Sequence, residues 1–129
     1  MPATFTYNKK EKLKSKKLLD ELFTQGNSFV VFPIKIFFKV VENKLPDTTI
    51  QVGVGVSKKY FKHATKRNRI KRLLRETYRQ NKLSLHELLN NNNKQLTVFF
   101  LYIDKELISY QTLENKMKIA IEKLIKQLS

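Results

Sequence analysis

The spacing of hydrophobic and polar positions divides the chain into helical and extended segments. A first helix is expected from about residue 15 to Gly26 and Asn27, which would end it in a left-handed conformation. Its apolar side comprises Leu18, Leu19, Leu22 and Phe23. A second helix is expected over about residues 65–80, and its apolar arc comprises Ile70, Leu73, Leu74, Thr77 and Tyr78. A C-terminal helix is predicted by Leu113, Met117, Ala120, Ile121, Leu124 and Leu128.

Three extended segments lie between these helices. Residues 34–41 are rich in β-branched and aromatic side chains, and this strand is expected to start after Pro33 because proline cannot donate to a strand ladder. Residues 49–56 show the alternation of a second strand. Residues 96–103 form a continuous apolar run, which is typical of a strand buried on both faces.

Turn signals and element order complete the expected architecture. Residues 43–47, which include Pro46, predict a hairpin loop between the first two strands, and the four Asn residues at 90–93 predict a loop before the third. The order helix-strand-strand-helix-strand-helix, without a linker or repeat, predicts one α+β domain over residues 1–129 with two packed layers. Residues 1–14 are basic and lack periodicity, so a flexible arm is expected there.

Charge is the most unusual feature of the composition. The chain has 26 Lys and Arg against 11 Asp and Glu, a formal net charge of +15. Self-repulsion of this size destabilises the compact state unless a polyanion relieves it, so nucleic acid is the first expected partner and an anionic membrane the second. The polar N-terminus and the absence of a long apolar run predict a cytoplasmic protein without a membrane span. No cysteine is present, which excludes disulfides and thiolate metal sites.

The positive charge is concentrated between Lys58 and Arg79, where ten Lys or Arg accompany one acidic residue, Glu76. A solvated helix usually mixes both signs, whereas this one accepts like-charge repulsion, and the arginine fork suits bidentate contact with phosphate. The segment therefore predicts a nucleic-acid-binding surface; a membrane-binding, acidic-protein-binding or merely solvated helix is the alternative. The candidate RNA-binding residues are Lys58, Lys59, Lys62, Lys66, Arg67, Asn68, Arg69, Lys71, Arg72, Arg75 and Arg79.

The motifs that would signal catalysis are incomplete. The stretch GVGVSKK, which begins at Gly53, has Lys58 where a dinucleotide fingerprint needs its third glycine, and it lacks the Gly-Lys-Ser/Thr of a phosphate loop. Gly53 and Gly55 are instead expected to let another backbone or side chain press on the strand. The two histidines, His63 and His86, are distant in sequence and have no carboxylate cluster nearby, so neither a catalytic residue nor a protein-bound metal is expected.

Two adjacent aromatic residues in the first long strand need different surroundings. Phe37 and Phe38 must point to opposite faces of the sheet, because side chains alternate along a strand. One of them is expected in the core. The other is either covered by a helix or forms a platform on which unpaired bases stack, and the sequence pattern leaves both interpretations open.

The stretch VSKKYFKHATKRNRIKRLLRETYR at 56–79 resembles the signature of the bacterial ribonuclease P protein component. In that family an Arg-Asn-Arg triplet is followed by Ile-Lys-Arg and a further Arg. The corresponding residues here are Arg67, Asn68, Arg69, Ile70, Lys71, Arg72 and Arg75. The resemblance is strong over 53–80 and fair over 13–39, where LKSKKLLDELFTQGNSF is similar to the family's first helix and glycine turn. Beyond residue 81 only the order of elements agrees.

The resemblance implies a fold and a function. The fold is an α/β sandwich of order α-β-β-β-α-β-α with a left-handed βαβ crossover, similar to domain 2 of ribosomal protein S5, and it has one strand more than the periodicity predicts. The function is that of a protein subunit that binds the catalytic RNA and the 5′ leader of precursor tRNA and supports endonucleolytic removal of the leader. Mg²⁺ held on the RNA would cleave the phosphodiester, with no protein active site and no obligatory protein partner.

The resemblance also implies a leader-binding cleft built from aromatic residues of the first helix and the first strand. The matching positions are Leu19, Phe23 and Phe37, so leucine replaces one of the family's aromatic residues.

Two other functions stay open. A ribosomal or other structural RNA-binding protein would share the charge and the sandwich without a role in cleavage. A helix-turn-helix DNA-binding protein would use residues 65–80 as its recognition helix, although strands are predicted where its flanking short helices should lie.

Overall fold

The middle layer of the molecule is a mixed sheet, which has four strands in the part of the chain that the computed structural model describes, residues 9–45 and 48–129. The strands are β1 (Asn27–Val31), β2 (Ile34–Val41), β3 (Ile50–Val56) and β4 (Gln95–Tyr102). They lie in the order β1-β2-β4-β3, with β2 antiparallel to both β1 and β4 and with β3 parallel to β4. The last strand of the chain is therefore inserted between two earlier strands.

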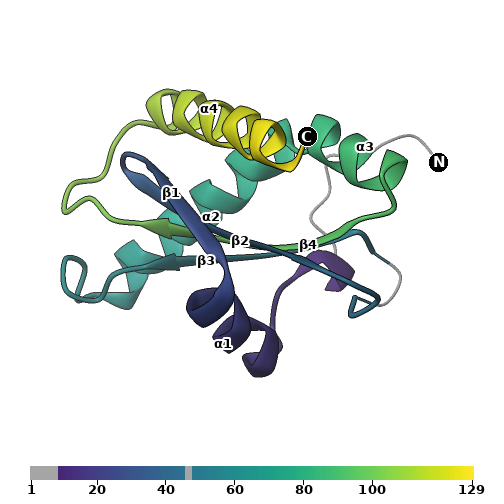
Figure 1. Cartoon of the computed structure of the whole chain (residues 1–129). Helices are drawn as coiled ribbons and strands as arrows, with labels where there is room; N and C mark the ends of the chain where they lie inside the picture. The colour runs from purple at the N-terminus through teal and green to yellow at the C-terminus, as the bar shows by residue number, and fades with distance from the viewer. Residues whose placement is uncertain (1–8, 46–47) are drawn as a thin grey trace.

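Helices lie on both faces of this sheet (Figure 1). They are α1 (Lys16–Gln25), α2 (Ala64–Asn81), α3 (Leu83–Asn91) and α4 (Tyr110–Leu128), and a short 3-10 turn, η1 (Lys9–Glu11), precedes them. α2 packs on α4 to form the helical layer of the sandwich, while α1 crosses the opposite face over β2 and β4 (Figure 1). The expected order α-β-β-β-α-β-α is confirmed, with α3 as an additional helix before β4. No helix within the described ranges is long and apolar enough to cross a bilayer.

The hydrophobic core lies between the sheet and the layer of α2 and α4. Phe38 and Val98 point into it, whereas their neighbours Phe37 and Phe99 point to the face that α1 crosses. The predicted apolar faces of α2 and α4 are confirmed. The buried residues of α2 are Ile70, Leu74, Thr77 and Tyr78, and those of α4 are Leu113, Met117, Ala120, Ile121, Leu124 and Leu128. Burial of each large apolar side chain contributes about 1.5–3 kcal/mol, so this layer fixes the orientation of α2.

The strand pairing differs from the local expectations. Residues 27–31 form the edge strand β1, which turns into β2 at Phe32 and Pro33. The hydrophobic pattern alone did not predict this strand, because the first strand was expected to begin only after Pro33, whereas the order of elements implied by the family resemblance includes it. The predicted hairpin between β2 and β3 is wrong, because β4 lies between these two strands.

Two other expectations about chain turns are corrected. The asparagine-rich segment is helical up to Asn91, since Leu85 and Leu89 lie one turn apart on α3 and are both fully buried. Gly26 does not adopt a left-handed conformation, because its φ is −79° and its ψ is 174°. Glycine is required there for another reason. A Cβ atom at Gly26 would lie 2.5 Å from the carbonyl oxygen of Leu22.

The segment before α1 packs against the sheet where the structure describes it. Of the flexible arm expected over residues 1–14, residues 1–8 lie outside the described residues. Leu13 is buried, and its backbone N–H donates to the carbonyl of Val52 at 3.0 Å. Lys12 also forms an isolated parallel bridge with Val52. This part of the expected arm therefore adds a short bridge to the edge of β3.

Glu11 anchors the same segment from inside the molecule. Its buried carboxylate accepts hydrogen bonds from Nζ of Lys82, at 3.1 Å to each oxygen, and lies 3.3 Å from Nε2 of His86. The hydroxyl of Tyr78 lies 3.0 Å from the same ring nitrogen. Burial disfavours the charged carboxylate, but the hydrogen bonds from His86 and Lys82 outweigh this effect and hold the pKa of Glu11 below its ordinary value. The cluster joins the N-terminal segment to the junction of α2 and α3.

Candidate nucleic-acid interface

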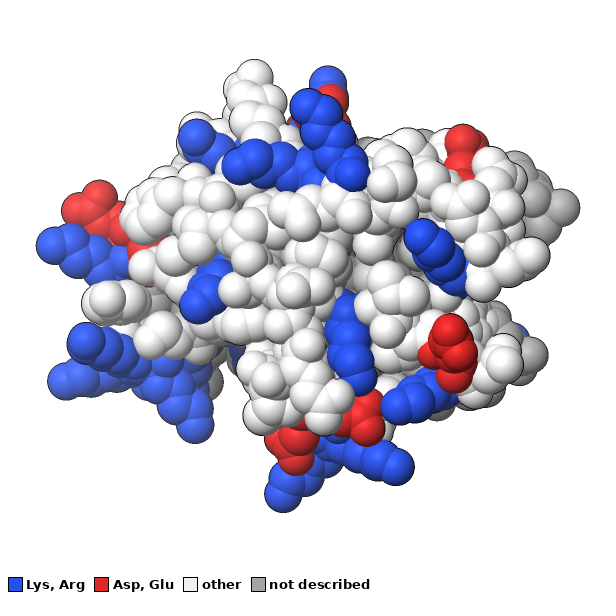
Figure 2. Space-filling model, in the orientation of Figure 1, with Lys and Arg blue, Asp and Glu red and all other residues white. Residues whose placement is uncertain are grey.

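α2 presents a basic surface on the sides that do not face the sheet. Figure 2 shows Lys and Arg side chains gathered at the lower left, at the end of the molecule where α2 begins. Eight of the candidate RNA-binding residues are exposed: Lys58, Lys59, Lys62, Lys66, Asn68, Arg69, Arg72 and Arg75. The other three, Arg67, Lys71 and Arg79, are partly buried. The structure therefore places the whole candidate set on α2 or on the loop that precedes it.

One side of α2 carries an open groove of about 440 Å³, which we call the arginine groove. Its lining residues are Thr65, Asn68, Arg69, Arg72 and Arg75. Thr65, Asn68, Arg72 and Arg75 recur at intervals of three or four, and Arg69 lies beside Asn68, so the five residues share one side of the helix. Three guanidinium groups border one space with no acidic side chain in its lining. Their mutual repulsion destabilises the free protein, and a ligand with several phosphates would relieve it.

Arg67 has a different position from its neighbours in the Arg-Asn-Arg triplet. Its Nη1 donates hydrogen bonds to the carbonyl oxygens of Phe61 at 2.8 Å and Lys62 at 2.6 Å. Because Phe61 is itself buried, the guanidinium holds the loop between β3 and α2 against the start of the helix. Arg67 therefore fixes the loop at 57–63, which we call the lysine-bearing loop, whereas Asn68 and Arg69 line the arginine groove.

Aromatic side chains meet on the face of the sheet that α1 crosses. Phe23 of α1 and Phe37 of β2 contact each other edge to face, with ring centroids 5.0 Å apart. Phe23 is 46% exposed, so the contact is open to solvent on one side. Nζ of Lys35 lies 5.0 Å from the centroid of the Phe37 ring. The structure thus brings together both predicted aromatic residues, while Leu19 lies one turn earlier on α1 and is partly buried.

Phe99 of β4 is the third member of this aromatic cluster and is not among the site residues predicted from the sequence. Its ring centroid lies 5.1 Å from that of Phe23, and it pairs with Phe37 in the β2–β4 register. The continuous apolar run of β4 concealed which of its residues face away from the core. Alternation counted from a buried neighbour such as Val98 was the signal that could have placed Phe99 on the outer face.

Two glycines of β3 provide the space that the Phe99 ring occupies. A Cβ atom at Gly53 would lie 2.8 Å from Cδ2 of Phe99, and one at Gly55 would lie 2.7 Å from Cζ. Both separations are shorter than Cβ contacts in proteins allow. The prediction that another side chain presses on this strand at the two glycines is confirmed.

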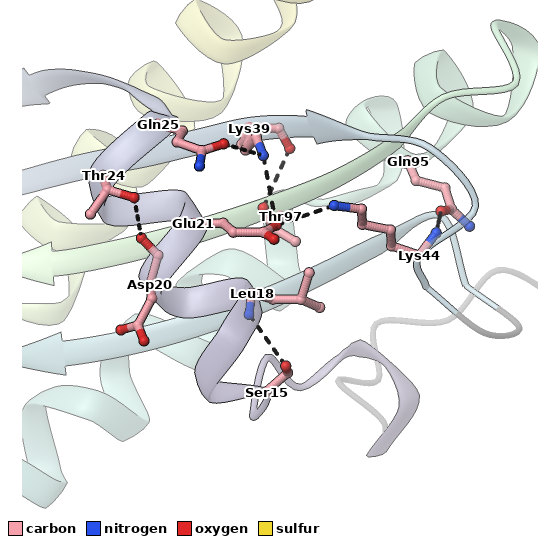
Figure 3. A network of polar contacts seen from close by, with 10 residues as sticks. All are labelled: Ser15, Leu18, Asp20, Glu21, Thr24, Gln25, Lys39, Lys44, Gln95 and Thr97. Carbon is pink, nitrogen blue, oxygen red and sulfur yellow. Dashed lines mark hydrogen bonds and ion pairs between the residues drawn. The ribbon is translucent and has the colours of Figure 1, made fainter.

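A polar network holds α1 over the sheet (Figure 3). The Glu21 carboxylate lies 3.3 Å from Nζ of Lys44 and 3.7 Å from Nζ of Lys39, and the latter also donates to Oε1 of Gln25 at 3.2 Å. The hydrogen bond from Lys44 holds the pKa of Glu21 below its ordinary value. Leu22 is fully buried beneath the helix. These contacts fix α1 and therefore the aromatic cluster that it borders.

The two histidines have separate surroundings. His63 precedes α2, and its side chain caps none of the helix N–H groups. His86 belongs to the Glu11 cluster. Across residues 9–45 and 48–129, no group of three or more His, Cys, Asp or Glu side chains could hold a metal ion. The basic surface of α2 offers arginine and lysine charges, and the aromatic cluster offers partly exposed rings; both are groups suited to binding.

The arrangement is that of a known class of structure, the RNase P proteins. The RNase P protein from Thermotoga maritima matches it with a TM-score of 0.65 and 22% identity, over 92% of this chain and 98% of that chain. A Staphylococcus aureus RNase P protein mutant with defective mRNA degradation activity matches with a TM-score of 0.64 and 17% identity, over 88% of this chain and 87% of that chain. At these identities the likeness shows the fold.

Sequence comparison then identifies the family. The profile of the Ribonuclease P family matches residues 7–125. The ribonuclease P protein component of Porphyromonas gingivalis is 36% identical over 118 residues, which cover 91% of this chain and 85% of that protein. The ribonuclease P protein component of Chlorobium phaeobacteroides is 36% identical over 97 residues, which cover 74% of this chain and 66% of that protein. The chain belongs to the ribonuclease P protein family, and the resemblance drawn from its Arg-Asn-Arg segment is confirmed.

Proposed function

We propose that this chain is the protein subunit of ribonuclease P, an endoribonuclease, and that it supports removal of the 5′ leader from precursor tRNA in the cytoplasm. In this proposal the protein binds the catalytic RNA and the leader, while the RNA performs the cleavage. Membership of the family supports the general assignment. One observation carries the finer roles: a single short segment joins the aromatic cluster to the arginine groove. Phe99 lies on Gly55 near the end of β3, and the lysine-bearing loop after β3 leads directly into α2.

The arginine groove suits the phosphate backbone of RNA. Guanidinium groups make bidentate contacts with phosphate oxygens, and such contacts position a nucleic acid without reading its sequence. This property fits a subunit that must serve many different tRNA precursors. The loop between the arginine groove and the aromatic cluster adds the positive charge of Lys58, Lys59 and Lys62. A single RNA strand could therefore pass from the arginine groove to the aromatic cluster over basic side chains.

The aromatic cluster suits unpaired bases. Nucleotides upstream of the cleavage site are single-stranded, so their bases can stack on an exposed ring, and each such stack contributes about 1–3 kcal/mol by alanine substitution. The edge-to-face contacts with Phe37 and Phe99 hold the half-exposed Phe23 ring in one orientation. A ring that is already ordered loses less conformational entropy when a base stacks on it.

Magnesium belongs to the RNA in this proposal. Mg²⁺ takes oxygen ligands, above all carboxylates, phosphates and water. The arginine groove has only Asn68 and Thr65 as neutral oxygen donors, and the aromatic cluster has none. These residues can hold RNA against the metal-bearing catalytic centre, but their chemistry does not fit a magnesium site of the protein's own.

The experiment that tests the proposal is cleavage of precursor tRNA by the cognate catalytic RNA at limiting magnesium, with and without the protein. We expect the wild-type protein to stimulate cleavage strongly, the Arg69→Ala/Arg72→Ala variant to stimulate it weakly, and the protein without RNA to cleave nothing. Binding to the RNA without any stimulation would favour a structural RNA-binding protein instead. Cleavage that survives removal of all RNA would overturn the assignment of catalysis to the RNA.

A further inference from the structure

The two flanks of α1 face different chemistry. At about 100° per residue, the residues before and after the buried Leu22 point to opposite sides of the helix axis. Phe23 lies on the flank with the aromatic cluster. Glu21 lies on the other flank and reaches Lys44 of the β2–β3 connection (Figure 3). The body of α1 therefore separates the aromatic cluster from whatever the second flank binds.

The second flank borders an open groove of about 430 Å³, which we call the lysine groove. Three segments form it: the approach to α1 with its first turn, the connection after β2, and the start of β3. Its charged lining residues are Lys12, Lys14, Lys17, Lys44 and Glu21, and Gln51 lies at its edge on β3. Four lysines against one glutamate leave a net lining charge of 4 − 1 = +3.

Buried anchors hold the approach to α1, so that its lysines do not belong to a mobile tail. Leu13, between Lys12 and Lys14, is buried and bonded to the backbone of β3. The side chain of Gln51 donates to the carbonyl of Lys10 at 3.2 Å, and the hydroxyl of Ser15 caps the first turn of α1.

The connection after β2 is fixed in the same way. Oε1 of Gln95 accepts the backbone N–H groups of Lys44 at 2.9 Å and Leu45 at 3.1 Å, and Leu45 is buried. The lysines thus project from a defined frame rather than from disordered surface.

The one acidic residue of the groove does not cancel its charge. Glu21 is already engaged by both Lys44 and Lys39, the latter at 3.7 Å from outside the groove lining. Lys14 and Lys17 are exposed residues of the lining, and Lys17 lies one turn before Glu21 on α1. The lining contains no aromatic ring on which a base could stack. The chemistry is therefore that of repeated electrostatic contact with a backbone of several negative charges.

We propose that the lysine groove binds the sugar-phosphate backbone of a second RNA segment, which belongs to the catalytic RNA and not to the leader. This inference rests on the function proposed above. The position of α1 supports it, because nucleotides stacked on Phe23 are on the far flank of the helix from Lys14 and Lys17. The protein would then hold RNA on three separate surfaces: the arginine groove, the aromatic cluster and the lysine groove.

The test compares the Lys14→Gln/Lys17→Gln variant with the wild type. Affinity for the cognate catalytic RNA, transcribed in vitro, is measured over a series of salt concentrations. We expect weaker binding and a log–log salt slope reduced by roughly two, about one for each lost phosphate contact. The ratio of holoenzyme affinities for leader-bearing and mature tRNA should stay unchanged. The variant Lys14→Arg/Lys17→Arg, which keeps the charge, should retain both the affinity and the slope.

A matched control removes the same charge elsewhere. Lys118 and Lys126 are exposed on α4, on the other side of the sheet, and Lys118→Gln/Lys126→Gln should leave the slope near the wild-type value. A groove variant that behaves like this control, or one that loses only leader-bearing substrate, would overturn the inference. The Arg69→Ala/Arg72→Ala variant separates the two proposals. If Arg69→Ala/Arg72→Ala weakens binding and Lys14→Gln/Lys17→Gln does not, only the lysine-groove proposal is refuted. If neither variant weakens binding, the proposed function itself fails.

Discussion

The ring of Phe99 lies on Gly55, with its Cζ atom 2.7 Å from the point where a Cβ atom at that position would stand. The same ring meets Phe23 edge to face at a centroid distance of 5.1 Å. Because Gly55 has no side chain, the Phe99 ring can lie against β3. The Phe99 ring in turn supports the exposed ring of Phe23 on α1. The aromatic cluster depends on this glycine although glycine itself offers no contact to a base.

We expect Gly55→Ala to push the Phe99 ring aside and to disturb the Phe23 ring above it. Affinity of the holoenzyme for precursor tRNA should then fall by about fivefold, because about 1 kcal/mol of stacking is lost, while affinity for mature tRNA stays constant. Equilibrium binding of both substrates provides the measurement. The double variant Gly55→Ala/Phe99→Leu restores space in the packing but not the ring, so it should recover thermal stability without recovering leader affinity. Full recovery of leader affinity would show that the Phe99 ring has no part in the site.

Phe37→Ala should also lower the affinity for leader-bearing substrate selectively. Phe37 supports Phe23 at 5.0 Å, and the effect should lie within the range of about 1–3 kcal/mol for one stacked base. Binding of precursors with leaders of increasing length is the measurement. Removal of a fully buried Phe costs about 3–5 kcal/mol of stability, so the unfolding free energy must be measured in parallel. A variant that loses leader-bearing and mature tRNA equally would place Phe37 in the packing of α1 only.

Replacement of Arg69 and Arg72 by Ala should flatten the salt dependence of binding to the catalytic RNA. Each phosphate contact contributes about one unit to the log–log slope, so the loss of both arginines should reduce it by roughly two. Fluorescence anisotropy with labelled RNA from low to high salt measures the slope. Arg67→Lys is the informative comparison, because Arg67 donates to two loop carbonyls and a lysine cannot reproduce its fork. We expect that variant to lower affinity with a smaller change in slope. An unchanged slope in the double variant would move the RNA-binding face away from the arginine groove.

The helices could be predicted from the sequence because their apolar side chains repeat at one spacing and face one core. Ile70, Leu74 and Tyr78 show this on α2, and all three are buried. The insertion of β4 between β2 and β3 could not be predicted, since the pairing of strands distant in the chain depends on tertiary packing. α3 was missed because its asparagines suggested a loop, whereas burial of Leu85 and Leu89 outweighs that preference.

The candidate site could be predicted where charge or the family motif identifies it, and not where a contact depends on the fold. The density of positive charge pointed to Arg69 and Arg72, which line one groove. The hydrogen bonds of Arg67 to Phe61 and Lys62 depend on the conformation of a loop that has no periodicity. Phe99 could not be connected with Phe23 from the sequence, because the β2–β4 pairing places Phe99 beside Phe37 and only the packing of α1 on the sheet brings Phe23 to both rings.

A further prediction concerns Glu11, whose ion pair with Lys82 fastens the N-terminal segment to the α2–α3 junction. Glu11→Gln removes the carboxylate charge that pairs with the buried ammonium group of Lys82, so we expect a loss of about 3 kcal/mol in the free energy of unfolding at neutral pH. Urea denaturation followed by circular dichroism measures it. Glu87→Gln, at an exposed position on α3, is the matched control and should change stability by no more than about 0.5 kcal/mol.

The pH dependence of this difference gives the sharper test of the Glu11 ion pair. The pKa of Glu11 is held below its ordinary value of 4.5 in the folded protein, so the folded state favours the carboxylate and the unfolded state binds its proton more readily. The stabilisation is therefore fully present above the unfolded-state pKa and is lost as the pH falls through the folded-state pKa. The stability difference between wild type and Glu11→Gln should accordingly shrink as the pH falls from about 5.5 toward about 3. A stability difference that stays the same across this range would mean that the charge of the carboxylate does not hold the N-terminal segment in place. Hydrogen-bond geometry, which glutamine preserves in part, would then be the cause.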